Sequence, residues 1–495
     1  MKTIKITFLP FFFLMLLFTA CSESFLEEEV YSNLAPSNFY KTEQDAIASV
    51  SAVYNNLQLF GNEFWDQGLA WTNMTMASTD VMYAQWFAEY ENYTFNSAGY
   101  DFLVMWKQVY NTNNKANTVI ARLPGIPMND ALKSRLIAET KFLRALNYFN
   151  AVRWWGDVPV ILEEIKGFSD IKDVSRTSKA QVYDQILLDL QDAIQVLPVA
   201  YADASDAGRV TKGAAKALLG KVYLTRGWGG GPSPVNTADL QLAVDEFESL
   251  MITPYSYQLT DNLTDEWDYT KENNPALGYI FSAQYSKGLG FEGSWYAQNM
   301  QAMELESAWW GYSAPESWVQ GTGGFEINWV DGWNPVPVDK RLSLLWEDYT
   351  SLWWYYWCKK WRYEKYLGWA EHPQNYPIIR YADILLMHSE AMNELKASPD
   401  AEVVASINLV RIRAGVALYD FTAWTKNTFR EEIQNERNRE LWGEGVTWFD
   451  YVRKGMLVSR MTASGTANVT EKFNLYPIPK LEIDNNPSLI QNTGW

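Results

Sequence analysis

Half of the tryptophans in this chain gather in one short stretch. The chain has 24 Trp, and 12 of them lie between Trp295 and Trp369. Trp joins a large apolar ring to a polar N–H group, so it suits surfaces that are partly apolar and partly wet. An indole left in water forgoes about 2 kcal/mol of burial. This concentration therefore predicts a partner that lies flat on aromatic rings, as the C–H faces of sugar rings do.

Charged residues at helical spacing are the next candidates for chemistry. One group is Glu139 with Arg144, and a second group lies in a single C-terminal stretch. The second group comprises Glu436, Arg437, Arg439 and Glu440. Side chains three or four residues apart on a helix commonly pair, and arginine cannot act as a base. We therefore interpret both groups as structural ion networks and not as catalytic sites.

Metal and nucleophile chemistry have little support in the sequence. His372 and His388 have no second His, Cys or acid at metal-ligand spacing, so we predict no metal site and structural histidines. No phosphate-binding glycine loop and no serine nucleophile elbow occurs. Glycoside hydrolysis would need two carboxylates at a defined separation. No pattern pairs the candidate acids, which are Glu304, Glu306, Glu316 and Asp331.

The N-terminus has the layout of a lipoprotein export signal. Lys2 and Lys5 precede an apolar run, residues 6–18, that is too short for a relaxed membrane span. A small residue directly precedes Cys21, which favours cleavage there and acylation of the new terminal cysteine. Each buried methylene contributes roughly 0.8 kcal/mol, so several acyl chains make a firm anchor. We predict a lipoprotein signal peptide over residues 1–20.

Composition limits the partners of the remaining chain, residues 21–495. A hydrophobic content of 47% is enough for a sizeable core. The formal net charge of the whole chain, −18, argues against nucleic acid and against adhesion to anionic lipid. Cys358 is the only other cysteine besides Cys21, so no intrachain disulfide can form in the mature chain. The fold must be held together by packing alone.

Apolar residues recur at helical spacing through much of the chain, in segments that end at Gly or Pro. A glycine that belongs at a helix C-cap, Gly415, follows one of them. The predicted helices are 130–155, 179–197, 212–225, 238–251, 381–396, 401–414 and 428–442. Antiparallel helix pairs of this kind suggest a tetratricopeptide-like solenoid, although no clean 34-residue period is present.

Two segments lose this periodicity and are rich in aromatic residues, Gly and Asn: residues 64–100 and 259–378. They are too aromatic for disorder, and long irregular segments of a compact protein are usually functional. We predict loop-rich inserts on a helical scaffold. Within the second segment, the group from Trp346 to Trp369 alternates with basic residues, which favours a packed structural role with cation–π contacts.

Six blocks of sequence follow one another in an order typical of one family. The most specific block begins Arg380-Tyr381-Ala382-Asp383 and runs to residue 394. The other blocks span 138–159, 209–224, 407–415, 436–450 and 476–495. Together they resemble the SusD-like (RagB/SusD) family of outer-membrane nutrient-binding lipoproteins. This resemblance implies a single domain over residues 21–495, mostly α, with tetratricopeptide-like helix pairs and an irregular ligand-binding half.

The resemblance also implies where a glycan would bind. In the family the site is built from the segment after the first helices, here 80–86, and from a later loop, here 294–312. Trp329 and Trp333 follow, with amides and carboxylates beside them that suit sugar hydroxyls. The predicted ligand-binding residues are Asp80, Tyr83, Trp86, Trp295, Tyr296, Asn299, Trp309, Trp310, Trp329 and Trp333. A structural calcium ion occurs in some members of the family, but the sequence does not place one here.

The resulting expectation is a non-catalytic lipoprotein of the outer membrane, anchored at Cys21 on the cell surface. It would capture an uncharged glycan and pass it to a SusC-like TonB-dependent transporter. Neutral-to-acidic loops favour an uncharged ligand, because an anionic glycan would prefer a basic pocket. Two alternatives remain open. One is a secreted glycoside hydrolase, and the other is a peptide-binding helical-repeat protein, which would leave the tryptophan concentration unexplained.

Overall fold

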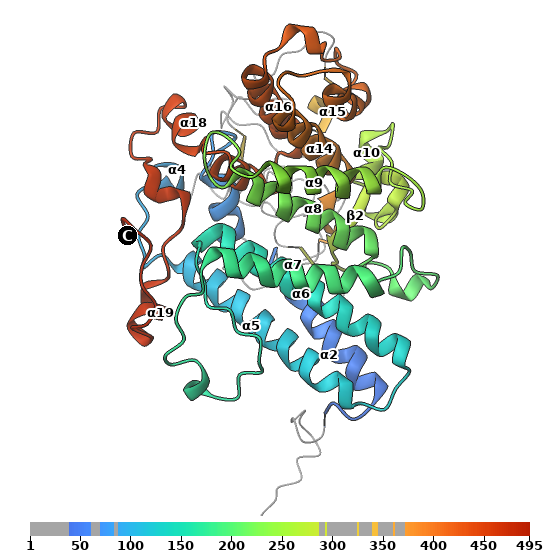
Figure 1. Cartoon of the computed structure of the whole chain (residues 1–495), viewed down its shortest axis with the longest axis vertical. Coiled ribbons are helices and arrows are strands. Elements are labelled where there is room, and N and C mark those ends of the chain that lie inside the picture. Colours follow the sequence, from blue (N-terminus) through green and yellow to red (C-terminus); the bar gives the residue numbers. More distant parts are fainter. Residues whose placement is uncertain are drawn as a thin grey trace, which may run out of the picture.

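A stack of antiparallel helices forms the body of the protein (Figure 1). The computed structural model describes residues 39–60, 70–83, 88–286, 293–294, 324–325, 339–344, 360–361 and 372–495. The helices of the stack are α2 (Glu43–Asn55), α5 (Tyr100–Arg122), α6 (Asp130–Trp155), α7 (Lys179–Val196), α8 (Lys212–Trp228), α9 (Thr237–Leu250), α14 (Tyr381–Leu395), α15 (Ala401–Ala414) and α16 (Lys426–Leu441). Successive helices of the stack pack on one another, except that α16 packs on α14 and not on α15. The predicted mostly-α fold is confirmed.

Local signals set the ends of these helices. The Asn129 side chain caps α6 by accepting from the Leu132 N–H, and the backbone turns at Gly156, whose φ is 73°. Helix α8 runs three residues beyond the predicted end and stops at Gly229, which adopts the left-handed conformation. Gly415 closes α15 in the same conformation, as predicted. All seven predicted helices are present, and α5 is an additional helix that the periodicity did not indicate.

Shorter helices complete the scaffold. After α16 the chain forms α17 (Thr447–Arg453) and α18 (Leu457–Ala463), then returns beside α6, where the Tyr476 N–H donates to the Trp154 carbonyl over 2.8 Å. The remaining short helices are α4 (Ala88–Glu91), α10 (Leu263–Glu266) and α19 (Lys480–Asn485). No helix in the described part of the chain is both long and apolar enough to span a membrane.

Two small antiparallel sheets join segments that are far apart in sequence. Strand β2 (Tyr279–Ala283) pairs with β4 (Tyr376–Arg380), and β1 (Met82–Tyr83) pairs with β3 (Gly324–Phe325). The first pair lies where the second loop-rich segment leaves the scaffold and where it returns. Pairing β2 with β4 therefore brings both ends of this segment to one place on the helical body.

Tryptophan also fills the core of the scaffold. Within the described ranges, six indoles have less than 2% of their surface exposed: Trp154, Trp155, Trp228, Trp361, Trp442 and Trp448. Trp361 belongs to the cluster between Trp295 and Trp369, whose other indoles lie outside the described residues. Large aromatic rings supply much of the buried apolar area that a disulfide-free chain needs.

Candidate functional site

The two loop-rich segments meet in the sheet formed by β1 and β3. Met82 lies opposite Phe325, and Tyr83 lies opposite Gly324. This pairing places the region that follows Asp80 against the middle of the second segment. The structure thus brings the two loop-rich segments together at this point, while residues 295–312, which were expected to share the site with 80–86, lie outside the described residues.

Asp80 is tied to the scaffold just before β1. Its carboxylate accepts a 2.6 Å hydrogen bond from the Tyr451 hydroxyl of α17, and Asn438 donates to the same hydroxyl over 2.7 Å. Burial raises the pKa of Asp80, against the opposing effects of Tyr451 and Arg460. These contacts position the first segment, and a direct role of Asp80 in ligand binding stays a prediction.

The other predicted contacts lie outside the described residues or are described only in part. Tyr83 is placed by its backbone in β1. The Ser294 N–H donates to the His372 carbonyl over 2.7 Å. This bond joins the residue before Trp295 to the end of the second segment. The residues outside the described ranges are Trp86, Trp295, Tyr296, Asn299, Trp309, Trp310, Trp329 and Trp333, together with Cys21 and the acids Glu304, Glu306, Glu316 and Asp331.

Aromatic rings form a buried base where the second segment returns. The Trp361 ring stacks on the Tyr376 ring with centroids 5.5 Å apart and an interplanar angle of 6°. Trp71 donates from its indole nitrogen to the Tyr376 hydroxyl over 3.0 Å, and that hydroxyl donates to the Glu444 carbonyl over 2.7 Å. Every ring here is at most 5% exposed. This part of the Trp346–Trp369 group is structural, as predicted.

Gly445 fits tightly against this base, and replacing it should be costly. Its φ is +67°, and an added Cβ would lie 2.6 Å from the Trp71 indole nitrogen and 2.9 Å from the Tyr376 hydroxyl. We expect Gly445→Ala to lower the free energy of unfolding by about 2–5 kcal/mol, from backbone strain plus overpacking. Denaturant unfolding measures this. Gly465→Ala is the control, because that site also has positive φ but open space around it, and it should lose only about 1–2 kcal/mol.

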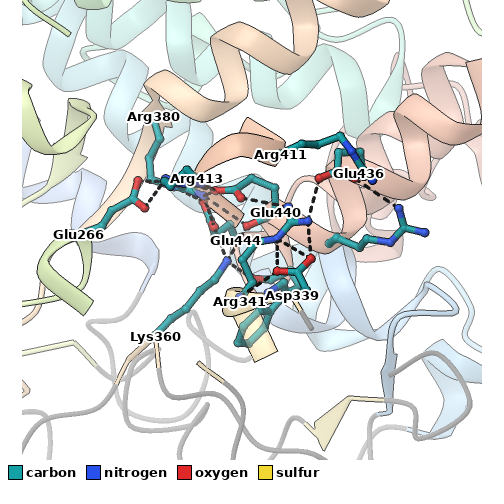
Figure 2. A network of polar contacts seen from close by, with 12 residues as sticks. Glu266, Asp339, Arg341, Lys360, Arg380, Arg411, Arg413, Glu436, Glu440 and Glu444 are labelled. Carbon is teal, nitrogen blue, oxygen red and sulfur yellow. Dashed lines mark hydrogen bonds and ion pairs between the residues drawn. The ribbon is translucent and has the colours of Figure 1, made fainter. Parts of the chain in front are cut away.

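An ion network connects the second loop-rich segment, residues 259–378 and called the insert below, to the helices through its described residues (Figure 2). Arg341, from the insert, contacts Glu436 over 2.8 Å and Glu440 over 3.3 Å. Lys360, also from the insert, donates to Glu444 over 2.7 Å. Its ammonium lies 4.9 Å from the Trp267 ring centroid and 4.4 Å from that of Trp442. These contacts confirm the predicted cation–π role for this lysine.

The ten residues labelled in Figure 2 are five carboxylates and five cations, and Arg439 adds a further contact to Glu436 over 3.3 Å. Arg380 bridges Glu266, over 2.6 Å, and Glu444, over 2.8 Å, while Arg413 contacts Glu266 over 2.8 Å and also pairs with Glu440. The ten residues are Glu266, Asp339, Glu436, Glu440, Glu444, Arg341, Lys360, Arg380, Arg411 and Arg413. All but Arg411 are buried. Buried charges are tolerated only when they are paired in this way.

The charged groups that could have been catalytic are therefore held in ion pairs. Glu139 is fully buried and contacts Arg135 and Arg209, while Arg144 pairs with Asp189 over 2.8 Å. The ion-network interpretation is confirmed for both groups of charges. Glu139 and Arg144 do not pair with each other: Glu139 contacts Arg135 of the same helix and Arg209, and Arg144 contacts Asp189 of α7.

The two histidines are held in the scaffold. Burial lowers the pKa of His372 to about 3, so its ring is neutral at physiological pH. His388 Nδ1 lies 3.0 Å from the Ser406 hydroxyl. Within the described ranges, no group of three or more His, Cys, Asp or Glu side chains is placed to hold a metal ion. The calcium ion implied by the resemblance stays without a place.

Glu272, at the base of the insert, makes the stability of the folded protein depend on pH. Its carboxylate accepts from the Asn375 N–H over 2.7 Å, just before β4. Burial raises the pKa of Glu272 to about 8, and the nearby Asp268 adds to the effect. A carboxyl whose pKa is raised on folding favours the folded state below about pH 4.5, and this contribution is lost as pH rises to about 8.

Glu272→Gln should therefore stabilise the protein at alkaline pH. The amide keeps the oxygen that accepts from Asn375 but carries no charge to bury. We expect a gain of about 2 kcal/mol at pH 8.5, allowing for partial exposure, and no gain at pH 4. Thermal unfolding of both proteins across this range is the measurement. A stability difference between the two proteins that is the same at all pH values would contradict a raised pKa of Glu272.

Sequence reasoning missed the residues that anchor the insert. Arg341 and Lys360 lie in aperiodic sequence. Arg341 pairs locally with Asp339, but the helix residues that hold the two cations are 80 to 99 residues away. The only available signal was a cation followed by a large apolar residue, as in Arg341-Leu342 and Lys360-Trp361. That pattern is common on surfaces and does not indicate burial.

Comparison with known proteins agrees with this architecture. A family model described as "SusD family" matches residues 342–495, and one described as "Starch-binding associating with outer membrane" matches residues 24–224. SusD-like protein P2 of Formosa agariphila is 25% identical over 99% of both chains.

Solved structures share the whole fold. A laminarin binding SusD-like protein is 25% identical, with a TM-score of 0.73 over 92% of this chain and 100% of that chain. A SusD homolog from Bacteroides thetaiotaomicron is 21% identical, with a TM-score of 0.76 over 92% and 98% of the two chains. With its helical stack, its aromatic insert and matches along both halves, the chain belongs to the SusD/RagB family of outer-membrane-associated proteins.

Proposed function

We propose that this protein captures an oligosaccharide or polysaccharide at the cell surface by aromatic stacking and performs no catalysis. It then releases the glycan to a SusC-like TonB-dependent transporter. The observation that carries the proposal is the β1–β3 pairing, which joins the two loop-rich segments above a buried, ion-paired base. A preformed aromatic platform limits the entropy lost on binding.

The laminarin-binding relative, similar in sequence and fold over nearly all of both chains, supports a glycan as the ligand. The acidic character of this chain, with a net charge of −18, favours an uncharged glycan over an anionic one. Micromolar affinity, about −8 kcal/mol, would suit capture followed by handover, because a weaker complex releases its ligand faster.

Affinity electrophoresis tests the proposal. The soluble chain from Ser22 onward is run in gels cast with neutral polysaccharides, laminarin, starch and xyloglucan, and with anionic alginate and pectin. We expect retardation in at least one neutral gel, equal mobility in the anionic gels and blank gels, and no release of sugar on long incubation. Retardation in none of them would reject glycan capture, and sugar release would favour the hydrolase.

The surface anchor is a second part of the proposal. Acylation at Cys21 would hold the chain at the outer membrane, where a transporter could receive its ligand. We expect the full-length chain to fractionate with the outer membrane and Cys21→Ser to lose that association. Surface exposure is checked by protease accessibility on intact cells, and co-purification with a TonB-dependent transporter encoded beside it checks the partner.

A further inference from the structure

A cavity of about 220 Å³ lies where the ends of α6, α7 and α8 meet α17. Its apolar wall includes Val152, Phe449 and Val452, and its polar wall includes three cations. Those cations are Arg153, Lys179 and Arg453, and none of the residues lining the cavity is acidic. In a chain with a net charge of −18, this makes the cavity unusual.

Only one of the three cations is neutralised. Arg453 pairs with Glu390 and, over 2.8 Å, with Asp450. Among the described residues, neither Arg153 nor Lys179 has a carboxylate within ion-pair distance of its charged group. Arg153 is half-buried and Lys179 is exposed. Two cations that line one cavity and have no ion-paired carboxylate repel each other, and an anion bound between them would relieve that repulsion.

The Arg153 guanidinium is held in place without a counter-ion. Its centre lies 3.7 Å from the Phe449 ring centroid and 4.1 Å from that of Phe149, and it donates to the Phe149 carbonyl and to Asn150. Burial lowers the pKa of Arg153 to about 9, which leaves the group charged at neutral pH. Stacking fixes the plane of the guanidinium while part of its donor set stays open. A planar fork of this kind matches an oxyanion.

A hydroxyl adds a further donor. Tyr183 of α7 lines the cavity and is 4% exposed overall, and its hydroxyl has no hydrogen-bond partner in the part of the chain that the structure describes. The hydroxyl is therefore free to donate to a group in the cavity. Arg153 and Tyr183 are close enough to influence each other electrostatically.

We propose that this cavity binds a small oxyanion, either an inorganic phosphate or sulfate or the carboxylate of an acidic sugar. Arg153 and Lys179 supply the charge, Tyr183 supplies a neutral donor, and the valines and Phe449 cover an apolar body. None of the residues that line the cavity is a predicted glycan contact. Phe449, Val452 and Arg453 share one face of α17, whereas Tyr451, which holds Asp80, projects from the opposite face.

Isothermal titration calorimetry of the chain from Ser22 onward tests the site with four probes: phosphate, sulfate, glucuronate and glucose. We expect saturable binding of at least one anion and none of glucose. In Lys179→Gln the Kd for that anion should rise about tenfold, as for loss of one charged hydrogen bond. Arg153→Gln should have at least as large an effect. Tyr183→Phe should weaken binding less, because a neutral donor is lost.

Lys212→Gln is the matched control. Lys212 opens α8 after the Thr211 cap, as Lys179 opens α7 after the Ser178 cap, but it does not line the cavity. Its Kd should equal that of the unchanged protein. Binding of phosphate or sulfate would identify an inorganic ion as the source, and binding of glucuronate alone would identify an acidic sugar. No binding of any anion, or equal binding in Lys179→Gln and Arg153→Gln, would overturn the proposal.

Discussion

Glu440→Gln is expected to lower the free energy of unfolding by about 3–5 kcal/mol, because it removes the shared counter-charge of three buried arginines. Glu440 contacts Arg341 and Arg380, each over 3.3 Å, and also pairs with Arg413. The substitution keeps the size of the side chain. It leaves the ten-residue network with one uncompensated positive charge in a site that is 3% exposed.

Equilibrium unfolding in urea, followed by far-ultraviolet circular dichroism, measures this loss. The control is Asp484→Asn, which breaks the exposed pair of Lys480 and Asp484 at 2.8 Å and should change stability by less than about 1 kcal/mol. Equal losses in the two variants would show that the network contributes no more than a surface pair does.

The same network makes a prediction about acid. Burial alone would raise the pKa of Glu436, but Arg341, Arg411 and Arg439 outweigh it and lower the pKa to about 2. A carboxylate whose pKa is depressed on folding stabilises the protein above its unfolded value, about 4.5. That stability is lost as pH falls from about 4.5 toward 2. Because Glu440→Gln is already less stable at neutral pH, it should unfold at a higher pH than the unchanged protein as the remaining carboxylates are protonated.

The double substitution Trp309→Ala, Trp310→Ala is expected to abolish retardation by the polysaccharide that binds the unchanged protein. These adjacent indoles belong to the predicted stacking platform. Loss of one stacked ring should weaken binding about tenfold, or about 1.4 kcal/mol, and loss of two should weaken it further. Stability should change little if the rings face the ligand and not the core.

Each Trp variant is compared with the unchanged protein in the same gels and by urea unfolding. Trp424→Ala is the control, because Trp424 packs on Tyr419 and Phe429 beside α16, outside both loop-rich segments. It should leave retardation unchanged. If the double variant binds as before, these two rings are not the platform; if it unfolds more easily by several kcal/mol, they belong to the core.

Local signals were enough for most of the helical scaffold. Helix α6 has the predicted bounds because a cap at Asn129 and a turn at Gly156 act within one turn of the helix. Helix α5 escaped prediction because its buried face includes Asn113 and Asn117. The side-chain oxygens of those amides accept from distant side chains, Asn147 over 3.0 Å and Arg144 over 2.8 Å, which a single segment cannot reveal.

In the candidate site, too, some features follow from local sequence and others depend on contacts between distant segments. The concentration of Trp between Trp295 and Trp369, and its loop-rich setting, could be recognised along the chain because both are properties of composition. Sequence order did not show that 82–83 would pair with 324–325, or that Arg341 and Lys360 would be buried. Side chains that pair across 80 residues or more carry their charge in the sequence but not the identity of their partner.

By itself, then, the sequence determined the class of the fold, the positions of most of its long helices and the family, and it predicted an aromatic ligand site. The tertiary structure alone decided that the insert is anchored by a balanced buried network and that Arg153, Lys179 and Tyr183 face one cavity. The physical reason is range. Helix periodicity and capping act over a few residues, whereas charge pairing and desolvation depend on which distant segments the packed helices bring together.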